Sequence, residues 1–450
     1  MGQSDPLRQG GVPCSRPSYT IRPSKLCALH LALSQPQLRH ITRVADALLV
    51  AEGPKTLSHL YRLCVEATDP SAVADCFRES PWTADDLRRP LQDFLLEDLL
   101  LLAEAYRLDK VLLVSIDDSL QKKHQQTRHL EAVDWHYDHL ESTRQKPRYK
   151  NGTAYVECNM QLPPQPEQGF PGAGYTYSWR IYLRAKTVRR LNRRRPKERR
   201  LRFKSKYRLA REMLVELSRA LPPGWRVYVL FDSWYASAQL IKFCRRNGWH
   251  VICALKPNRR LNGKQVRQHE AALWHRRYTQ VRVTAADGTS RTYQVRSLCG
   301  RIQEVPFEVC VYSSRRHYRD KSPKYFLCTD TTLSVRTVLN WYQRRWSCEV
   351  DNLYLHTALG LGDFRLQSYE AAEKWFSVVF LSLAYLQWRL IHERDDQEEV
   401  TNLADVMRLH RQEHTVDLLI SACQEVLRQK ALEPVLAWLL RPPPLKRRAA

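Results

Sequence analysis

The spacing of apolar residues changes at position 110, and this change constrains the fold more than any other feature of the sequence. From about 36 to 107 the apolar residues recur at intervals of three and four, which is typical of amphipathic helices. At 110 the run KVLLVSID begins, which is short, apolar and without helical spacing. Such a run is typical of a strand that is buried on both faces of a sheet. The sequence therefore predicts a helical region followed by an α/β core.

Later segments extend the α/β pattern. The apolar runs VYVLFD at 227–232 and VICALKP at 251–257 flank the segment 234–248, which has a helical pattern and Gly248 as its stop signal. Strand, helix and strand at this spacing predict a right-handed βαβ unit. A further apolar run lies near 177–185, and YRLAREMLVELSRAL predicts a helix. Between about 277 and 328 apolar and polar residues alternate around an Asp-Gly turn, which predicts an antiparallel β insert.

These patterns divide the chain into regions. We expect a disordered arm, a helical domain, an α/β core in two pieces, a β insert within that core, and a C-terminal helical region with a basic tail. Their bounds are 1–30 for the arm, 31–107 for the helical domain, 108–262 and 330–395 for the core, 263–329 for the insert and 396–450 for the C-terminal region. The segment KTLSHLYRLCVEATDPSAVADCF within the helical domain also fits a helix-turn-helix, although any two short helices joined by a turn would look alike.

The charge balance points to an anionic partner. Lys and Arg number 72 against 47 Asp and Glu, so the formal net charge is +25. Such a field attracts polyanions, and nucleic acid is the expected partner. The strongest local concentration is at 184–206, where thirteen Lys or Arg accompany a single Glu. Within it Lys204 and Lys206 are the expected DNA contacts, and the run either orders on DNA or stays a solvated loop.

The twelve cysteines argue against a zinc site. No two of them are closer than nine residues, whereas a zinc ribbon needs pairs two to four residues apart. Scattered single cysteines are typical of small buried residues in a reducing compartment. The most apolar stretch, Trp375 to Leu386, is too short to span a bilayer and no signal peptide is recognisable. We therefore expect a cytoplasmic protein.

Carboxylates stand where the predicted strands end. Asp117 and Asp118 close the first core strand, Asp232 closes VYVLF, and Glu349 lies on a helix after the β insert. In open α/β sheets ligands bind outside the carboxyl ends of strands, so these acids are expected to converge on one crevice. Hard oxygen ligands without a Cys or His cluster favour Mg²⁺, or Mn²⁺, over zinc. Two such ions can clamp the attacking and leaving oxygens of a phosphoryl transfer.

The residues around Glu349 suggest contacts with a DNA phosphate. Tyr342, Arg345 and His356 stand at spacings of three, four and seven around it and would share one face of a helix. A hydroxyl, a guanidinium and a further basic group beside a metal-binding Glu would hold a phosphate against the metal.

These motifs resemble those of bacterial insertion-sequence transposases of the DDE class with the Y-R-E-K signature. That signature is Tyr, two residues, Arg, three residues, Glu, six residues and Lys. The chain has Tyr342, Arg345 and Glu349 in register, and His356 where the family usually has Lys. A contact by His would depend on pH. The likeness covers roughly residues 35–390.

The resemblance implies a fold and a residue set. The fold is a ribonuclease-H-like mixed-sheet core interrupted by the β insert, with helical regions at both ends. The segment IDDS is similar to the first Asp motif, which favours Asp118 over Asp117 as a ligand, and the choice between the two stays open. FDSWYAS is similar to the second motif and implies Asp232 as a ligand and Tyr235 as a DNA contact. Some members stack a flipped base on a Trp of the insert, and Trp274 is the only Trp between 250 and 340.

The function implied is DNA transposition. Asp118, Asp232 and Glu349 would bind two Mg²⁺ ions, water would cleave at the ends of the element, and the freed 3′-hydroxyl would attack target DNA. The resemblance also implies a homodimer that bridges two element ends. Two alternatives remain: another ribonuclease-H-like nuclease, which would cut without joining, and a catalytically inactive DNA-binding derivative. The complete set of three acids argues against the second.

Overall fold

The computed structural model describes most of the chain. The described residues are 29, 31–63, 70–138, 141–143, 145–273, 277–284, 289–317, 319–320, 322–394, 400–429 and 432. The arm expected at 1–30, apart from Leu29, the Asp-Gly turn and the basic tail lie outside them.

Helices form the N-terminal region, as the periodicity predicts. They are α2 (Gln35–Val50), α3 (Leu57–Leu60), a short 3₁₀ turn (Tyr61–Leu63), α4 (Pro70–Arg78) and α5 (Ala84–Ala105). α2 and α5 each begin with a capping box, at Ser34 and Thr83, which satisfies backbone donors of the first turn. The helix-turn-helix candidate spans α3 and α4, and residues 64–69 between them lie outside the described part.

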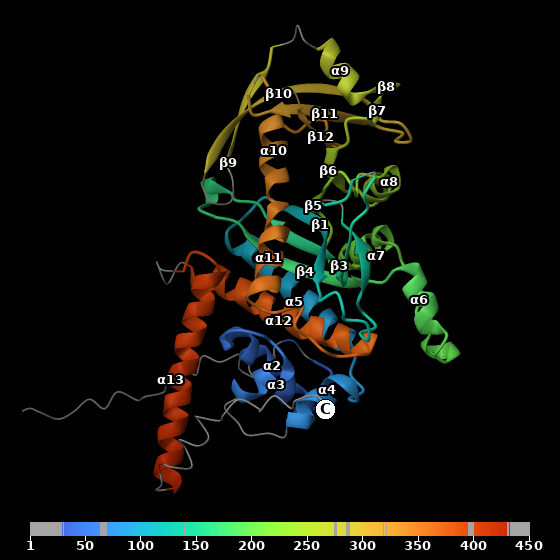
Figure 1. Cartoon of the computed structure of the whole chain (residues 1–450). Helices are drawn as coiled ribbons and strands as arrows, with labels where there is room; N and C mark the ends of the chain where they lie inside the picture. Colours follow the sequence, from blue (N-terminus) through green and yellow to red (C-terminus); the bar gives the residue numbers. More distant parts are fainter. Residues whose placement is uncertain are drawn as a thin grey trace, which may run out of the picture.

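A large mixed sheet forms the centre of the molecule (Figure 1). The strand order is β2-β3-β1-β5-β6-β12-β11-β10-β9. β4 pairs with β3 and is not part of this linear order. The bounds are β1 (Val111–Lys122), β2 (Asp134–Tyr137), β3 (Tyr149–Leu162), β4 (Ala173–Tyr182), β5 (Arg226–Phe231), β6 (His250–Leu255), β9 (Thr279–Thr284), β10 (Ser290–Arg301), β11 (Glu308–Arg315) and β12 (Lys324–Cys328). β1 pairs antiparallel with β3 and parallel with β5, which pairs parallel with β6. The predicted βαβ unit is confirmed.

Helices cover both faces of the β1, β5 and β6 region. On one face α7 (Lys206–Ala220) and α8 (Ala238–Arg246) pack on alternate apolar residues of β5 such as Val227, Val229 and Phe231. On the other face α10 (Val335–Gln343) packs on Leu113, Leu230 and Ile252. α11 (Trp346–Thr357) and α12 (Tyr369–Glu393) continue along that second face toward β3 and β4.

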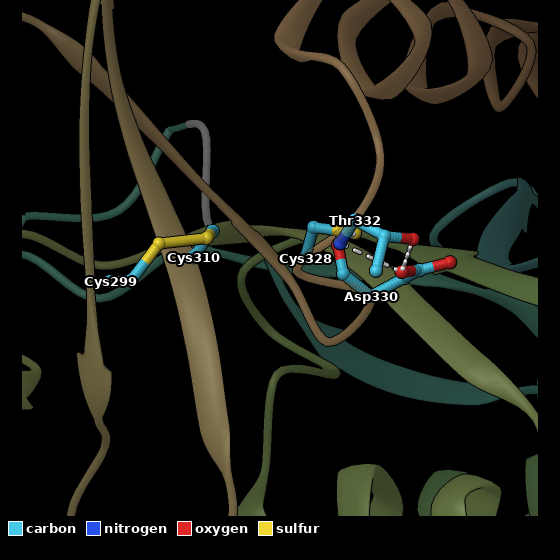
Figure 2. Close-up of a disulfide and its surroundings, with 5 residues drawn as sticks. All are labelled: Cys299, Cys310, Cys328, Asp330 and Thr332. Carbon is cyan, nitrogen blue, oxygen red and sulfur yellow. Dashed lines mark hydrogen bonds between the residues drawn. A yellow bond between two sulfur atoms is a disulfide. The ribbon is translucent and has the colours of Figure 1, made fainter.

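The antiparallel insert is not a separate sheet. β12 pairs with β6, so β9 to β12 continue the core sheet at its far edge. Here β7 (Arg260–Leu261), β8 (Lys264–Gln265) and α9 (Val266–Ala272) form a small addition. After β12, Asp330 accepts hydrogen bonds from the backbone and hydroxyl of Thr332 at 3.0 and 2.6 Å, which fixes the turn toward α10 (Figure 2).

A disulfide corrects the expectation that all cysteines are single thiols. Cys299 of β10 and Cys310 of β11 are direct partners in the ladder and are joined through their sulfur atoms (Figure 2). Seven further cysteines of the described part are free, and six of these are buried, as expected for small core residues. The spacing of eleven residues gives no sign of this pair in the sequence, because the pairing depends on strand register.

The remaining elements lie around this core. The basic run 184–206 contains α6 (Ala185–Asn192) and a 3₁₀ turn (Lys197–Arg199). α12 is a buried core helix, as the apolar stretch predicts. α13 (Leu403–Gln429) docks on α2 through His410 and His414, which contact Asp46 at 2.9 and 3.1 Å. Within the described part, no helix is both long and apolar enough to cross a membrane.

Candidate active site

Two acids meet where the parallel pairing of β1 with β5 ends. β1 itself continues to Lys122 in its pairing with β3, so the expectation that Asp117 and Asp118 close the first core strand is wrong. In the parallel register Ile116 lies beside Phe231, so Asp117 and Asp232 follow as neighbours on adjacent strands. One Asp232 carboxylate oxygen accepts the backbone N–H groups of Trp234 and Tyr235 at 2.9 and 3.1 Å. These bonds hold the turn that leads from β5 into α8, and they fix Asp232 at the sheet edge.

Asp117 and Asp118 face opposite sides of the sheet. Successive side chains of a strand alternate between its two faces. Asp117 contacts Arg345 on the face that α11 covers, whereas Asp118 forms an ion pair with Lys206 of α7 on the other face. Asp117 therefore shares a face with Glu349, and Asp118 does not. This geometry favours Asp117 over Asp118, which the sequence motif had favoured.

Arg345 joins the two halves of the site. One of its guanidinium nitrogens contacts the Asp117 carboxylate, and the other donates to Glu349 at 2.8 Å. The Arg345 side chain is 14% exposed and that of Glu349 38% exposed, so the cluster is sheltered but open to solvent at Glu349. A single cation thus bridges an acid of the sheet and an acid of the helix.

Burial dominates the electrostatics of Asp117. Desolvation raises the pKa of its carboxyl to about 7, with further upward contributions from Asp118 and Asp232 and an opposing one from Arg345. For Arg345 burial is the largest influence and acts to lower the pKa, but Asp117, Tyr342 and Glu349 together outweigh it and the pKa is raised. The two shifts are linked, because the Asp117 carboxylate favours the charged guanidinium and the guanidinium offsets part of the burial cost of the carboxylate.

A stripe of polar side chains on β3 holds α11 in place. Glu157, Asn159 and Gln161 alternate along a strand that is otherwise apolar and buried. Hydrogen bonds run from Asn159 to Asp351 at 2.7 Å, from Asn352 to Glu157 at 2.7 Å, and from Gln161 to Ser347 and to the Arg344 carbonyl. Buried polar groups need such partners, so these bonds fix the rotation of α11 and the position of Glu349.

Glu157 is a further acid beneath the site. It is the direct ladder partner of Asp117 and is fully buried. Burial, together with the nearby Asp351 and Asp117, raises its pKa well above the usual range for Glu. Sequence reasoning missed β3 altogether. The signal available was the period-two pattern of polar residues in YVECNMQL, which is typical of a strand.

The helix expected to carry the whole signature is interrupted. Tyr342 lies on α10 and Glu349 on α11, and Arg344 and Arg345 form the junction. Figure 1 shows the two helices running end to end. Tyr342 packs against Phe326 with ring centroids 4.8 Å apart, and burial raises its pKa to about 12. The Tyr342 ring still lies beside Arg345, 6.0 Å from the guanidinium carbon.

His356 does not stand as an exposed basic group. Its ring nitrogen lies 3.2 Å from the Tyr155 hydroxyl and 3.4 Å from that of Ser119. Burial lowers the pKa of His356 to about 4. The ring is therefore neutral at neutral pH, which does not fit the expectation of a charged phosphate contact.

The other expected DNA contacts have varied surroundings. Tyr235 is 1% exposed, packed against Tyr207 and Trp234, so its burial does not fit a contact with DNA. Lys206 pairs with Asp118, and Lys204 pairs with Glu212 at 2.7 Å. Trp274 lies outside the described residues.

The donor set at the sheet edge suits a hard cation. Asp117, Asp232 and Glu349 offer carboxylate oxygens, which are the ligands that Mg²⁺ and Mn²⁺ prefer. The Arg345 guanidinium between two of them shows that a positive charge fits there. Among the described residues, no three Cys, His, Asp or Glu side chains converge closely enough to hold an ion in this conformation.

Comparisons with known proteins connect this site with a family. Residues 201–385 match the family model described as the transposase DDE domain. The matched segment contains Asp232, Arg345 and Glu349 and begins after Asp117. No curated protein matches the chain.

One solved structure that the chain resembles is piggyBac transposase, in a synaptic complex with hairpin DNA. The two are 13% identical, with 95% of this chain and 77% of that chain covered, and the TM-score is 0.43. The family match thus rests on residues 201–385, and it supports a DDE transposase.

Proposed function

We propose that the protein is a DNA transposase that cuts at the ends of an insertion element and joins them to target DNA. The observation that carries the proposal is the bridge from Asp117 through Arg345 to Glu349, which lies beside Asp232. Asp232, Arg345 and Glu349 belong to the segment that matches the DDE domain. A ribonuclease-H-like core and a homodimer bridging two element ends are parts of this proposal. The mixed sheet, with acids where the parallel pairing of β1 with β5 ends, supports the first of these.

Each residue has a role in the proposal. Asp117, Asp232 and Glu349 hold two Mg²⁺ or Mn²⁺ ions, which when bound supply the charge that stabilises in-line phosphoryl transfer. Arg345 turns from the acids to the DNA phosphate, since guanidinium groups bind phosphate with paired hydrogen bonds. The buried hydrogen bonds between β3 and α11 keep Glu349 in register with the strand ends.

The test is cleavage and strand transfer on DNA that carries the flanking terminal repeats. Wild type is compared with Glu349→Gln and with Glu308→Gln, a control at an exposed glutamate of β11. The proposal expects Mg²⁺-dependent cutting and joining by wild type and by the control, and DNA binding without either reaction by Glu349→Gln. Cutting without joining would instead indicate a nuclease. Binding without any cutting by wild type would indicate an inactive DNA-binding derivative.

A further inference from the structure

A cavity lies between α7 and α8. Its volume is about 620 Å³. α7 ends shortly before β5 begins, and α8 begins shortly after β5 ends. Both helices therefore have their N-termini near the carboxyl end of β5. Ser205 and Ser237, the N-caps of the two helices, line the cavity at the end nearest the acids. The cavity is therefore a groove that begins at the edge of the sheet where the acids stand, on the face opposite to Glu349.

Arginines line the length of this groove. Arg208, Arg211 and Arg219 all face it from α7. At a rise of about 1.5 Å per residue, the first and last of them stand about 16 Å apart along the helix. That length accommodates several nucleotides of an extended strand, which repeats its phosphate every few ångströms.

The acids that line the groove are already neutralised. Glu212 accepts from Lys204 at 2.7 Å and from Arg208 at 3.1 Å. One guanidinium nitrogen of Arg180 donates to both carboxylate oxygens of Glu216, at 2.5 and 2.6 Å. Because Lys204 and Arg180 stand outside the groove, the charge left facing it is positive. In the described part of the chain no acidic side chain pairs with Arg211 or Arg219, and both are exposed.

An aromatic ring stands at the mouth of the groove. Tyr207 lines it and stacks on Trp234 with ring centroids 4.7 Å apart. Between Tyr207 and Ser205 lies Lys206, whose ammonium group reaches Asp118 of β1. A basic groove that tracks the backbone, with an aromatic ring for stacking, is the arrangement by which proteins bind single-stranded nucleic acid.

We propose that the groove between α7 and α8 binds a single DNA strand, the one that leads away from the phosphate held at the carboxylates. The volume is that of a small-molecule cleft, too small to enclose a duplex. The inference rests on the proposed function for the identity of the nucleic acid. The groove adds Arg211, Arg219 and Tyr207 to the residues that contact DNA.

The experiment measures binding of two fluorescein-labelled probes by anisotropy at several salt concentrations. The probes are a dT20 single strand and a blunt 20-base-pair duplex. The variants are Arg211→Glu and Arg219→Glu, and the matched control is Arg408→Glu, which reverses an exposed arginine of α13. Thermal unfolding confirms that each variant is folded.

Each groove variant is expected to weaken dT20 binding several-fold more than the control. Each groove variant should also reduce the steepness of the plot of log affinity against log salt concentration by about 0.7 for each lost phosphate contact. Binding of the duplex should change no more than in the control. If the groove variants bind dT20 as the control does, or lose both probes equally, the inference is overturned.

Cleavage assays on the same proteins separate the two proposals. Failure of wild type to cut any DNA contradicts the proposed function but leaves the dT20 result decisive for the groove. Cleavage by wild type, with dT20 binding unaffected in the groove variants, contradicts the groove alone.

Discussion

Arg345, at the start of α11, contacts the Asp117 carboxylate in the middle of β1, and this contact ties the helix that carries Glu349 to the centre of the sheet. The same guanidinium reaches Glu349 at 2.8 Å. Before a metal ion binds, Arg345 is thus the counter-charge of the two acids. Its removal should therefore affect stability and metal binding together.

Arg345→Ala should lower the free energy of unfolding by about 1–3 kcal/mol, because two sheltered carboxylates then face each other without their partner. Added Mg²⁺ should recover more stability in this variant than in wild type, since a cation replaces the missing charge. Thermal unfolding with and without Mg²⁺ measures both effects. Arg344→Ala is the control, because Arg344 makes no ion pair with these acids. An equal loss in the control, or an equal response to Mg²⁺, would contradict the role given to Arg345.

Asn159→Ala should lower the free energy of unfolding by about 1–3 kcal/mol, because Asp351 keeps its buried position but loses a hydrogen bond of 2.7 Å. The displaced α11 should also slow DNA cleavage. Denaturant unfolding and the cleavage rate are measured on the same protein. A variant that loses stability but cuts at the wild-type rate would show that this bond does not position Glu349.

His356 should contribute to acid sensitivity rather than to DNA binding. Burial lowers its pKa to about 4 from the ordinary 6.5, so the folded state binds fewer protons than the unfolded state in this range. The stability that the neutral ring contributes is present above about pH 6.5 and is lost as the pH falls toward about 4. His356→Gln should therefore flatten the decline of unfolding free energy between these pH values. DNA affinity should depend on pH in the same way in both proteins between pH 6 and 8. A difference between the two pH profiles would indicate that His356 does contact a DNA phosphate.

The disulfide between Cys299 and Cys310 should stabilise the insert. Closing a short loop by a disulfide contributes about 2–4 kcal/mol. Dithiothreitol should lower the unfolding midpoint of wild type and leave that of Cys310→Ser unchanged. A wild-type midpoint that does not respond to the reductant would mean that the two thiols are not joined in solution.

Much of the fold could be predicted from periodicity, because burial imposes it. The N-terminal helices, the strands β1, β5 and β6 and the helix α8 all follow from local patterns. β3 shows a period-two pattern of polar residues in YVECNMQL, but that pattern predicts one exposed face, whereas β3 is buried on both faces by packing against distant helices that no local pattern records. The continuity of the insert with the core depends on the pairing of β12 with β6, a contact between distant segments that no local pattern records.

The site was predictable in its residue types and less so in its geometry. Asp232, Arg345 and Glu349 gather near the strand ends, as the spacing predicts. The choice between Asp117 and Asp118 depends on which face of β1 each occupies, and that follows from strand register rather than from the motif. The burial of Tyr235 and the contacts of His356 with Tyr155 and Ser119 likewise depend on packing that the local sequence does not record.

The measurement that tests the central claim most directly compares Asp117→Asn with Asp118→Asn in Mg²⁺-dependent DNA cleavage. The two substitutions are identical in chemistry, lie one residue apart and differ in the sheet face they occupy. Loss of a ligand that contributes several kcal/mol to the transition state predicts a rate at least about a hundredfold lower for Asp117→Asn. Asp118→Asn should retain most of the activity. The reverse order, with Asp118→Asn inactive and Asp117→Asn active, would contradict the site described here.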